Sequence, residues 1–166
     1  MGQRESKPAE QPERSLESDA IPVRNLVEAD LEAIVRIDAK AMGRRRVEYY
    51  RDKLAAALRD SRIHVSLAAE ADGMVVGFLM GDLHYGEFGR AEPSVIIDSV
   101  GVHPDYAKRG VGRALMRQFV ANVRALGAEQ VRTEVAWNDV ALLGFLDRCG
   151  FVPGRRLVLE LDVDAT

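Results

Sequence analysis

A buried strand that leads directly into a cationic, glycine-containing helix start is the feature that most limits how this 166-residue chain can fold. The strand is predicted over residues 94–102 (SVIIDSVGV), because β-branched residues dominate a short apolar run. After a proline-containing turn, the sequence Lys-Arg-Gly-Val-Gly-Arg leads into a helix predicted over residues 111–126. A strand that feeds a helix in this way is typical of sheets with helices packed on their faces.

The start of that helix has the chemistry of an anion-binding site. The first N–H groups of a helix have no intrahelical acceptor, and the helix dipole favours negative charge there. Gly110 and Gly112 lack a Cβ atom, so a phosphate can approach their backbone closely. Lys108, Arg109 and Arg113 add positive charge. Neither the Walker motif nor the dinucleotide-binding fingerprint fits the segment. The alternative to an anion site is a helix start whose glycines serve only tight packing.

Hydrophobic periodicity predicts the remaining elements of the chain. Their order is β-α-α-β-β-β-α-β-α-β-β, which predicts an α/β (α+β) three-layer domain with a mixed, mostly antiparallel sheet flanked by helices. The Asp72-Gly73 pair predicts a hairpin turn between the second and third strands. Further strands are predicted over residues 21–27, 65–70, 74–83, 131–137, 151–152 and 157–162, and further helices over 31–42, 47–58 and 140–148.

The first 20 residues differ in composition from the rest of the chain. They hold two prolines and eight charged residues and few apolar ones. Such a segment buries too little surface to offset its ordering entropy. We therefore expect a disordered tail over residues 1–20 and a single domain over residues 21–166.

Charge and composition limit the class of partner. The formal net charge is −3, which gives no basic field for nucleic acid or an anionic membrane. One cysteine and three histidines argue against a metal centre. Neither a bilayer-spanning apolar stretch nor a secretory signal pattern is present. We expect a cytoplasmic monomer or homodimer with no metal, nucleic-acid or membrane partner.

Two segments resemble the signatures of the GNAT superfamily of acyl-CoA-dependent N-acyltransferases. The first is the strand end at residues 100–102, followed by His-Pro-Asp-Tyr and by x-x-x-Gly-x-Gly into a helix. The second is Thr-Glu-Val-Ala-Trp-Asn at residues 133–138, followed by a helix and Gly-Phe. The resemblance covers essentially the whole chain after residue 20. It implies a GNAT-like fold and an N-acetyltransferase that transfers the acetyl group of acetyl-CoA by direct attack of an amine, from a small molecule, peptide or protein.

The resemblance also implies roles for individual residues. Backbone N–H groups of residues 108–114 would hold the CoA diphosphate, and the pantetheine arm would pair with the strand edge exposed where residues 94–102 and 131–136 diverge. The N–H near Val102 would face the thioester carbonyl. Gly101 independently indicates a bulge or a close backbone approach. Asn138 would contact the CoA arm, cap the following helix, or both. The implied cofactor-binding residues are Val100, Gly101, Val102, Lys108, Arg109, Gly110, Val111, Gly112, Arg113, Ala114 and Asn138.

Two departures from the family pattern concern the donors of hydrogen bonds and protons. Ala107 stands where the family usually has a Gln or Arg that binds the phosphate arm. The helix tyrosine that many members use as a general acid is replaced by Phe145 or Leu146, depending on the alignment. A non-catalytic acyl-CoA-binding regulatory module therefore remains the alternative to an enzyme.

Two carboxylates in apolar strands are the candidate catalytic bases. An ammonium acceptor must lose a proton before it attacks a thioester. Glu134 matches a base that some members of the family use, and Asp98 lies in the strand that should abut the thioester. Either is alternatively an ion-paired or solvated carboxylate at a strand edge. The arginines at residues 44–46 either receive an acidic acceptor or form a solvated charged loop.

Overall fold

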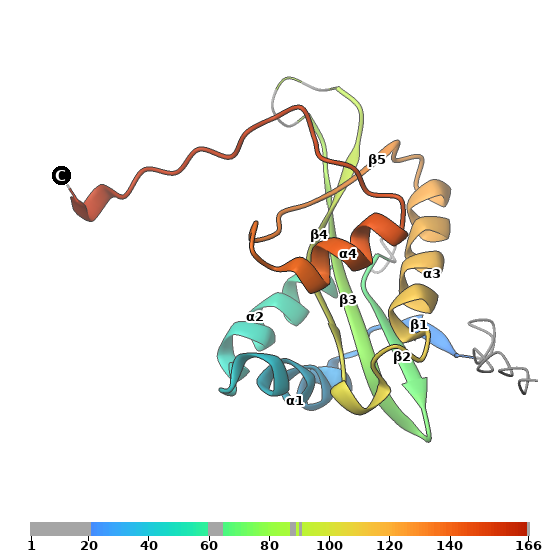
Figure 1. The fold of residues 1–166 in the computed structure, drawn as a ribbon. Coiled ribbons are helices and arrows are strands. Elements are labelled where there is room, and N and C mark those ends of the chain that lie inside the picture. The colour runs from blue at the N-terminus through green and yellow to red at the C-terminus, as the bar shows by residue number, and fades with distance from the viewer. Residues whose placement is uncertain (1–20, 60–64, 87–88, 90, 166) are drawn as a thin grey trace, which may run out of the picture. The chain divides into compact units, whose positions relative to one another are not determined.

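A five-stranded sheet in the order β1-β2-β3-β4-β5 organises the computed structural model, which describes residues 21–59, 65–86, 89 and 91–165 (Figure 1). The first four strands pair antiparallel and β4 pairs with β5 in parallel, so the predicted mixed, mostly antiparallel sheet is confirmed. The tail predicted over residues 1–20 lies outside the described residues. The strands are β1 (Val23–Asn25), β2 (Leu67–Ala71), β3 (Met74–His84), β4 (Ser94–Val102) and β5 (Gln130–Thr133).

Helices cover both faces of this sheet, as the three-layer prediction requires. Helices α1 (Leu31–Met42) and α2 (Val47–Ala57) lie on one face, and α3 (Val111–Ala125) lies on the other (Figure 1). Two glycines mark how closely the helices approach. A Cβ atom on Gly77 would lie 2.6 Å from Val111 Cγ1 of α3, and one on Gly101 would lie 3.1 Å from Ile37 Cγ2 of α1. Short 3-10 turns precede α1 (η2, Glu28–Asp30) and follow β4 (η4, Pro104–Tyr106).

The hairpin between β2 and β3 forms where the sequence predicts it. Asp72 and Gly73 both have positive φ angles, +52° and +72°. Two successive positive φ values give the turn whose twist matches a β-hairpin. The Asp-Gly prediction is therefore confirmed.

The structure explains the glycine at position 101 by side-chain packing and not by a bulge. The bulge in β4 falls at Asp98, where the register against β3 shifts, and not at Gly101. A Cβ atom on Gly101 would lie 2.7 Å from Phe78 Cε1. The glycine is thus required by the packing of Phe78 and α1 against β4, and the expected bulge at this residue is wrong.

A buried ionic cluster joins α1 to α2. Asp38, with 8% of its surface exposed, accepts hydrogen bonds from Arg46 at 2.5 and 2.8 Å and from the Tyr50 hydroxyl at 2.9 Å. The Arg46 hydrogen bonds hold the pKa of Asp38 below its ordinary value, and burial raises the pKa of Tyr50 above its own. Tyr50 also packs edge-on against Phe78 at 5.7 Å. The cluster therefore fixes α2 over the sheet.

The chain after β5 departs from the predicted strands. The chain divides into two compact units, one that ends at Thr133 and a second that starts at Glu134. The second unit contains α4 (Val140–Arg148) and a 3-10 turn, η5 (Val163–Ala165). Strand β5 stops at Thr133 and does not reach residue 137, and residues 151–152 and 157–162 form no strand. Apolar alternation provides side chains that suit a strand, but a strand also needs a neighbouring strand to pair with. Residues 151–152 and 157–162 pair with none of the described strands.

None of the helices described is long and apolar enough to cross a membrane. Within the described residues, no group of three or more His, Cys, Asp or Glu side chains is arranged to hold a metal ion.

Replacing Gly101 by alanine tests the packing of β4 against α1. Because the new methyl would collide with Phe78, we expect Gly101→Ala to lower the free energy of unfolding by about 1–3 kcal/mol in urea denaturation. Gly144 in α4 is the matched control, since the nearest atom to a Cβ there is Arg148 Nη1 at 3.5 Å. Gly144→Ala should be neutral or stabilise by up to about 1 kcal/mol. Equal effects of the two substitutions would contradict the close approach.

Replacing Asp38 by asparagine tests the buried cluster. Removing the carboxylate leaves Arg46 without its charge partner, so we expect Asp38→Asn to cost about 3–5 kcal/mol of stability at pH 7. The pKa of Asp38 is lower in the folded state, so its contribution is present above pH ~4 and is lost as the pH falls below that value. Unfolding measured across this pH range should therefore show a weaker acid dependence in the variant. An unchanged acid dependence would show that other carboxylates control it.

Candidate active site

Strands β4 and β5 form a fork whose last paired residues are Ile97 and Thr133. The Thr133 hydroxyl donates a hydrogen bond of 2.9 Å to the Ile97 carbonyl, which closes the ladder at this point. On the other side of β4, Ser99 pairs with Met80 and Ile97 pairs with Gly81, so Asp98 is the extra residue of a bulge. A bulge bends its strand and increases its twist. The bulge and the end of the β4–β5 pairing therefore coincide, as the predicted divergence of the two strands requires.

Beyond the fork, β4 presents an open edge to the side where β5 has ended. The His103 N–H donates to the Val76 carbonyl on β3 at 2.8 Å. In an antiparallel pair, alternate residues direct their N–H and C=O groups to opposite edges. Val100 and Val102 therefore direct both groups away from β3. The ladder with β5 includes neither residue, so this edge is able to pair with an extended ligand.

The open edge leads into the turn and helix start singled out in the sequence. Lys108 and Gly110 both have positive φ angles, +61° and +89°, and α3 begins at the next residue, Val111. The Tyr106 hydroxyl donates a hydrogen bond of 2.7 Å to Asp72 in the β2–β3 hairpin, which raises the pKa of Tyr106. Arg109 lies over the Tyr106 ring, 5.4 Å from its centroid. The hairpin thus anchors the turn that presents the first N–H groups of α3.

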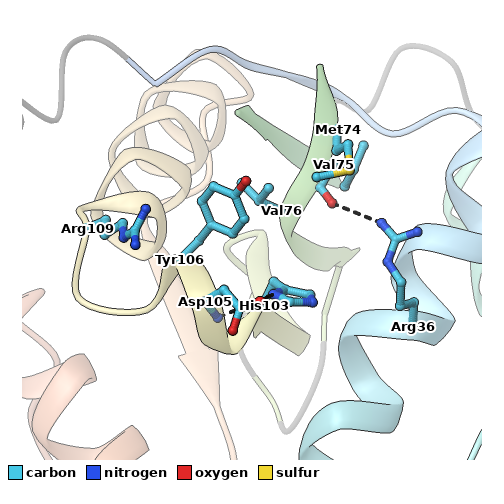
Figure 2. Close-up of a pocket in the computed structure, with 8 residues that line it drawn as sticks. All are labelled: Arg36, Met74, Val75, Val76, His103, Asp105, Tyr106 and Arg109. Carbon is cyan, nitrogen blue, oxygen red and sulfur yellow. Dashed lines mark hydrogen bonds and ion pairs between the residues drawn. The ribbon is translucent and has the colours of Figure 1, made fainter. Parts of the chain in front are cut away.

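A cavity of about 530 Å³ lies beside this turn, on the β3 side of it (Figure 2). Arg36 of α1 borders it and donates a long hydrogen bond of 3.5 Å to the Val75 carbonyl. Arg109 and Tyr106 border it from the turn, so the Arg109 side chain faces this cavity as well as the helix start. The cavity is lined by Arg36, Met74, Val75, Val76, His103, Asp105, Tyr106 and Arg109.

The two candidate bases follow, in the chain, the two residues of the last β4–β5 pair. Asp98 follows Ile97, and its side chain is 44% exposed and forms an ion pair with Lys53 of α2. Ser99 Oγ lies 3.4 Å from the same carboxylate oxygen. Glu134 follows Thr133 and is exposed. Asp98 is therefore not the desolvated carboxylate that its apolar sequence context indicates, because α2 supplies a cation to it.

Asn138 and the arginines at residues 44–46 differ in part from the expectations. Asp139, and not Asn138, caps α4, by accepting a hydrogen bond of 3.0 Å from the Leu142 N–H. Arg45 forms an ion pair with Glu32 at 2.8 Å, and Arg46 is held in the Asp38 cluster. The charges of these two arginines are therefore compensated within the protein, and an acidic acceptor is not favoured there.

The sequence did not identify two residues at the fork, Lys53 and Thr133. Lys53 reaches Asp98 from a helix 45 residues away in the chain, and Thr133 reaches the Ile97 carbonyl from 36 residues away. Spacing along the chain carries no signal for either contact, since each depends on how α2 and β5 lie against β4. A threonine at the end of a predicted strand is a weak indication at most.

Comparisons with known proteins show the family and the fold of the chain. The model of the acetyltransferase (GNAT) family matches residues 31–151. The aminoglycoside N(6')-acetyltransferase type 1 of Stenotrophomonas maltophilia is 30% identical over 109 residues, which are 64% of this chain and 71% of that protein. A solved transcriptional regulator from Bacillus halodurans C-125 aligns with a TM-score of 0.73 and 18% identity over 86% of this chain and 99% of its own.

An aminoglycoside acetyltransferase, AAC(6')-Iy, solved with the bisubstrate analog CoA-S-monomethyl-acetylneamine, aligns with a TM-score of 0.72 and 17% identity. The alignment covers 86% of this chain and 97% of that chain. Identities this low show a common fold, whereas the family model spans most of the chain, including β4, the turn and α3. The chain therefore belongs to the acetyltransferase (GNAT) family and is an acyl-CoA-dependent N-acetyltransferase.

Proposed function

We propose that the protein transfers the acetyl group of acetyl-CoA to a primary amine, and that the fork between β4 and β5 is where the transfer occurs. The observation that carries the proposal is the open edge of β4, which starts at the fork and ends at the anion-binding turn. Support also comes from solved relatives whose complexes contain CoA or a CoA-based bisubstrate analog.

The edge and the turn define how acetyl-CoA would lie. The N–H groups of residues 108–113 hold the diphosphate, with positive charge from Lys108 and Arg113. The Ala114 N–H, expected from the sequence to join them, donates instead to the Gly110 carbonyl at 2.9 Å and is not available. The pantetheine amides pair with the N–H and C=O groups of Val102 and with the C=O group of Val100, in the manner of an added strand. A ligand anchored at the turn and extended along β4 has its acyl end at the fork. We therefore assign the N–H that faces the thioester carbonyl to Val100, one pairing step nearer the fork than the Val102 N–H expected from the sequence.

Asp98 is the base that this arrangement favours. The acceptor ammonium gives a proton to the Asp98 carboxylate, and the neutral nitrogen then attacks the thioester carbon. As the C–N bond forms, the C–S bond breaks and the nitrogen gives up its second proton to solvent. The protonated carboxyl can return the first proton to the CoA sulfur. A returning proton removes the need for an acid on α4, where Phe145 is half-buried and Leu146 is buried and neither can donate. Glu134 is the second candidate for the same step.

A cationic amine, such as that of an amino sugar, is the acceptor class that the charges favour. The side chain of Asp82 lies on the same face of β3 as Phe78 and Met80, by the alternation of a strand, and is exposed. Asp82 pairs with Ile96, two residues before Asp98, so the two carboxylates lie on neighbouring strands on the α1–α2 face, and His84 Nε2 lies 3.3 Å from the Asp82 carboxylate. The names of several relatives point to the same class, since they are aminoglycoside acetyltransferases.

Replacing each candidate base tests the assignment of the proton acceptor. We expect Asp98→Asn to lower kcat/KM for a primary amine by about 100-fold or more, because general-base catalysis typically contributes 10²–10⁴-fold. Glu134→Gln should have a smaller effect, and Glu129→Gln, at an exposed carboxylate before β5, is its matched control. A large loss with Glu134→Gln and none with Asp98→Asn would transfer the role to Glu134. If transfer by the unaltered protein is absent although CoA binds, the non-catalytic module is the correct alternative.

Calorimetry with CoA tests the anion-binding turn. Arg113 is exposed in the first turn of α3, and a charge-assisted hydrogen bond to a phosphate contributes about 1.5–3 kcal/mol. We therefore expect Arg113→Met to weaken CoA binding by roughly tenfold or more. Arg124, in the last turn of the same helix, is the matched control, and Arg124→Met should leave the Kd within about twofold. Equal losses would show that general charge, and not the turn, binds the diphosphate.

A further inference from the structure

Lys53 occupies the position that the proposed function gives to the acceptor amine. Its ammonium pairs with Asp98, the carboxylate at the fork, although Lys53 lies on α2 and Asp98 lies on β4. From this contact we infer that Lys53 is a modification site of the enzyme itself, acetylated in cis by the acetyl-CoA that the protein binds. The inference rests on the proposed function, because it needs the acyl end of acetyl-CoA at the fork.

The surroundings of Lys53 hold its side chain at Asp98. The Lys53 side chain is 22% exposed, and its Nζ lies 4.9 Å from the centroid of the Tyr49 ring. Tyr49 packs edge-on against Tyr50 at 5.0 Å and lies under Arg46 at 4.6 Å. These partners belong to the buried Asp38 cluster, which fixes α2. The ammonium is therefore held at Asp98 by an ion pair and by the Tyr49 ring, on a helix that the Asp38 cluster fixes over the sheet.

The chemistry of the step is the same as that proposed for an external amine. Asp98 takes one proton from the Lys53 ammonium, which leaves a neutral amine beside the thioester. The nitrogen forms a bond to the acetyl carbon as the C–S bond breaks, and the nitrogen gives up its second proton. The products are N-ε-acetyl-lysine, CoA with a protonated sulfur, and one proton released to solvent. Acetylation removes the positive charge of Lys53 and frees Asp98 for an acceptor ammonium.

The composition of the chain makes the modification easy to locate. The sequence contains four lysines, Lys7, Lys40, Lys53 and Lys108. Lys40 is exposed near the end of α1 and serves as the internal reference for acetylation by free acetyl-CoA in solution. Acetylation of Lys53 blocks tryptic cleavage after that residue, so it yields a peptide of residues 52–59 (DKLAAALR) that the unmodified chain does not give.

The test is mass spectrometry of the full chain after incubation with acetyl-CoA, over time and at two protein concentrations. We expect Lys53 to gain one acetyl group faster than Lys40, with a first-order rate that does not depend on protein concentration. Asp98→Asn should slow the reaction at Lys53 by about 100-fold. Asp52→Asn, which removes an exposed carboxylate beside Lys53, should not slow it. Lys53→Arg should abolish the product, because a guanidinium keeps its proton.

Two results would overturn the inference. One is acetylation of Lys53 no faster than that of Lys40, and the other is an equal rate in Asp98→Asn. Acetyl transfer to an external primary amine, measured on the same samples, separates this failure from failure of the proposed function. If the external amine is acetylated but Lys53 is not, only the inference is lost, whereas if neither is acetylated, both are lost.

Discussion

The candidate site depends on one irregularity in the pairing of β4. This strand carries one residue more than β3 at Asp98, and its pairing with β5 ends at the preceding residue, Ile97. A bulge turns the strand away from its earlier direction, so β4 continues beside β3 while the neighbouring position is left open. The open edge, the position of Asp98 and the direction of the Val100 and Val102 backbone groups all follow from this irregularity.

Two anchors in the first unit hold the ends of that edge. At the fork, the Asp38–Arg46–Tyr50 cluster fixes α2, and α2 in turn brings Lys53 to Asp98. At the other end, the hydrogen bond between Tyr106 and Asp72 ties the turn before α3 to the β2–β3 hairpin. Neither anchor is part of the open edge. The position of the edge is therefore fixed by contacts that α2 makes at one end and the β2–β3 hairpin makes at the other.

The sequence was informative where local chemistry decides the structure. The Asp72-Gly73 turn, the helix start at Val111 and the end of β4 at Val102 are set by residues close together in the chain, and the structure confirms all three. The Lys53–Asp98 pair was not predictable, because it depends on how α2 packs. For residues 157–162 the sequence predicted a structure that is not there. Their apolar alternation favours a strand, but these residues form none.

The most direct measurement of the central claim is a crystal structure of the protein with CoA bound. The expected result is that the pantetheine amides pair with the backbone of Val100 and Val102 and that the diphosphate lies on the N–H groups of residues 108–113. The sulfur should then lie at the fork, beside Asp98. A structure in which CoA lies elsewhere, or in which another part of the chain pairs with Val100 and Val102, would contradict the role assigned to the open edge.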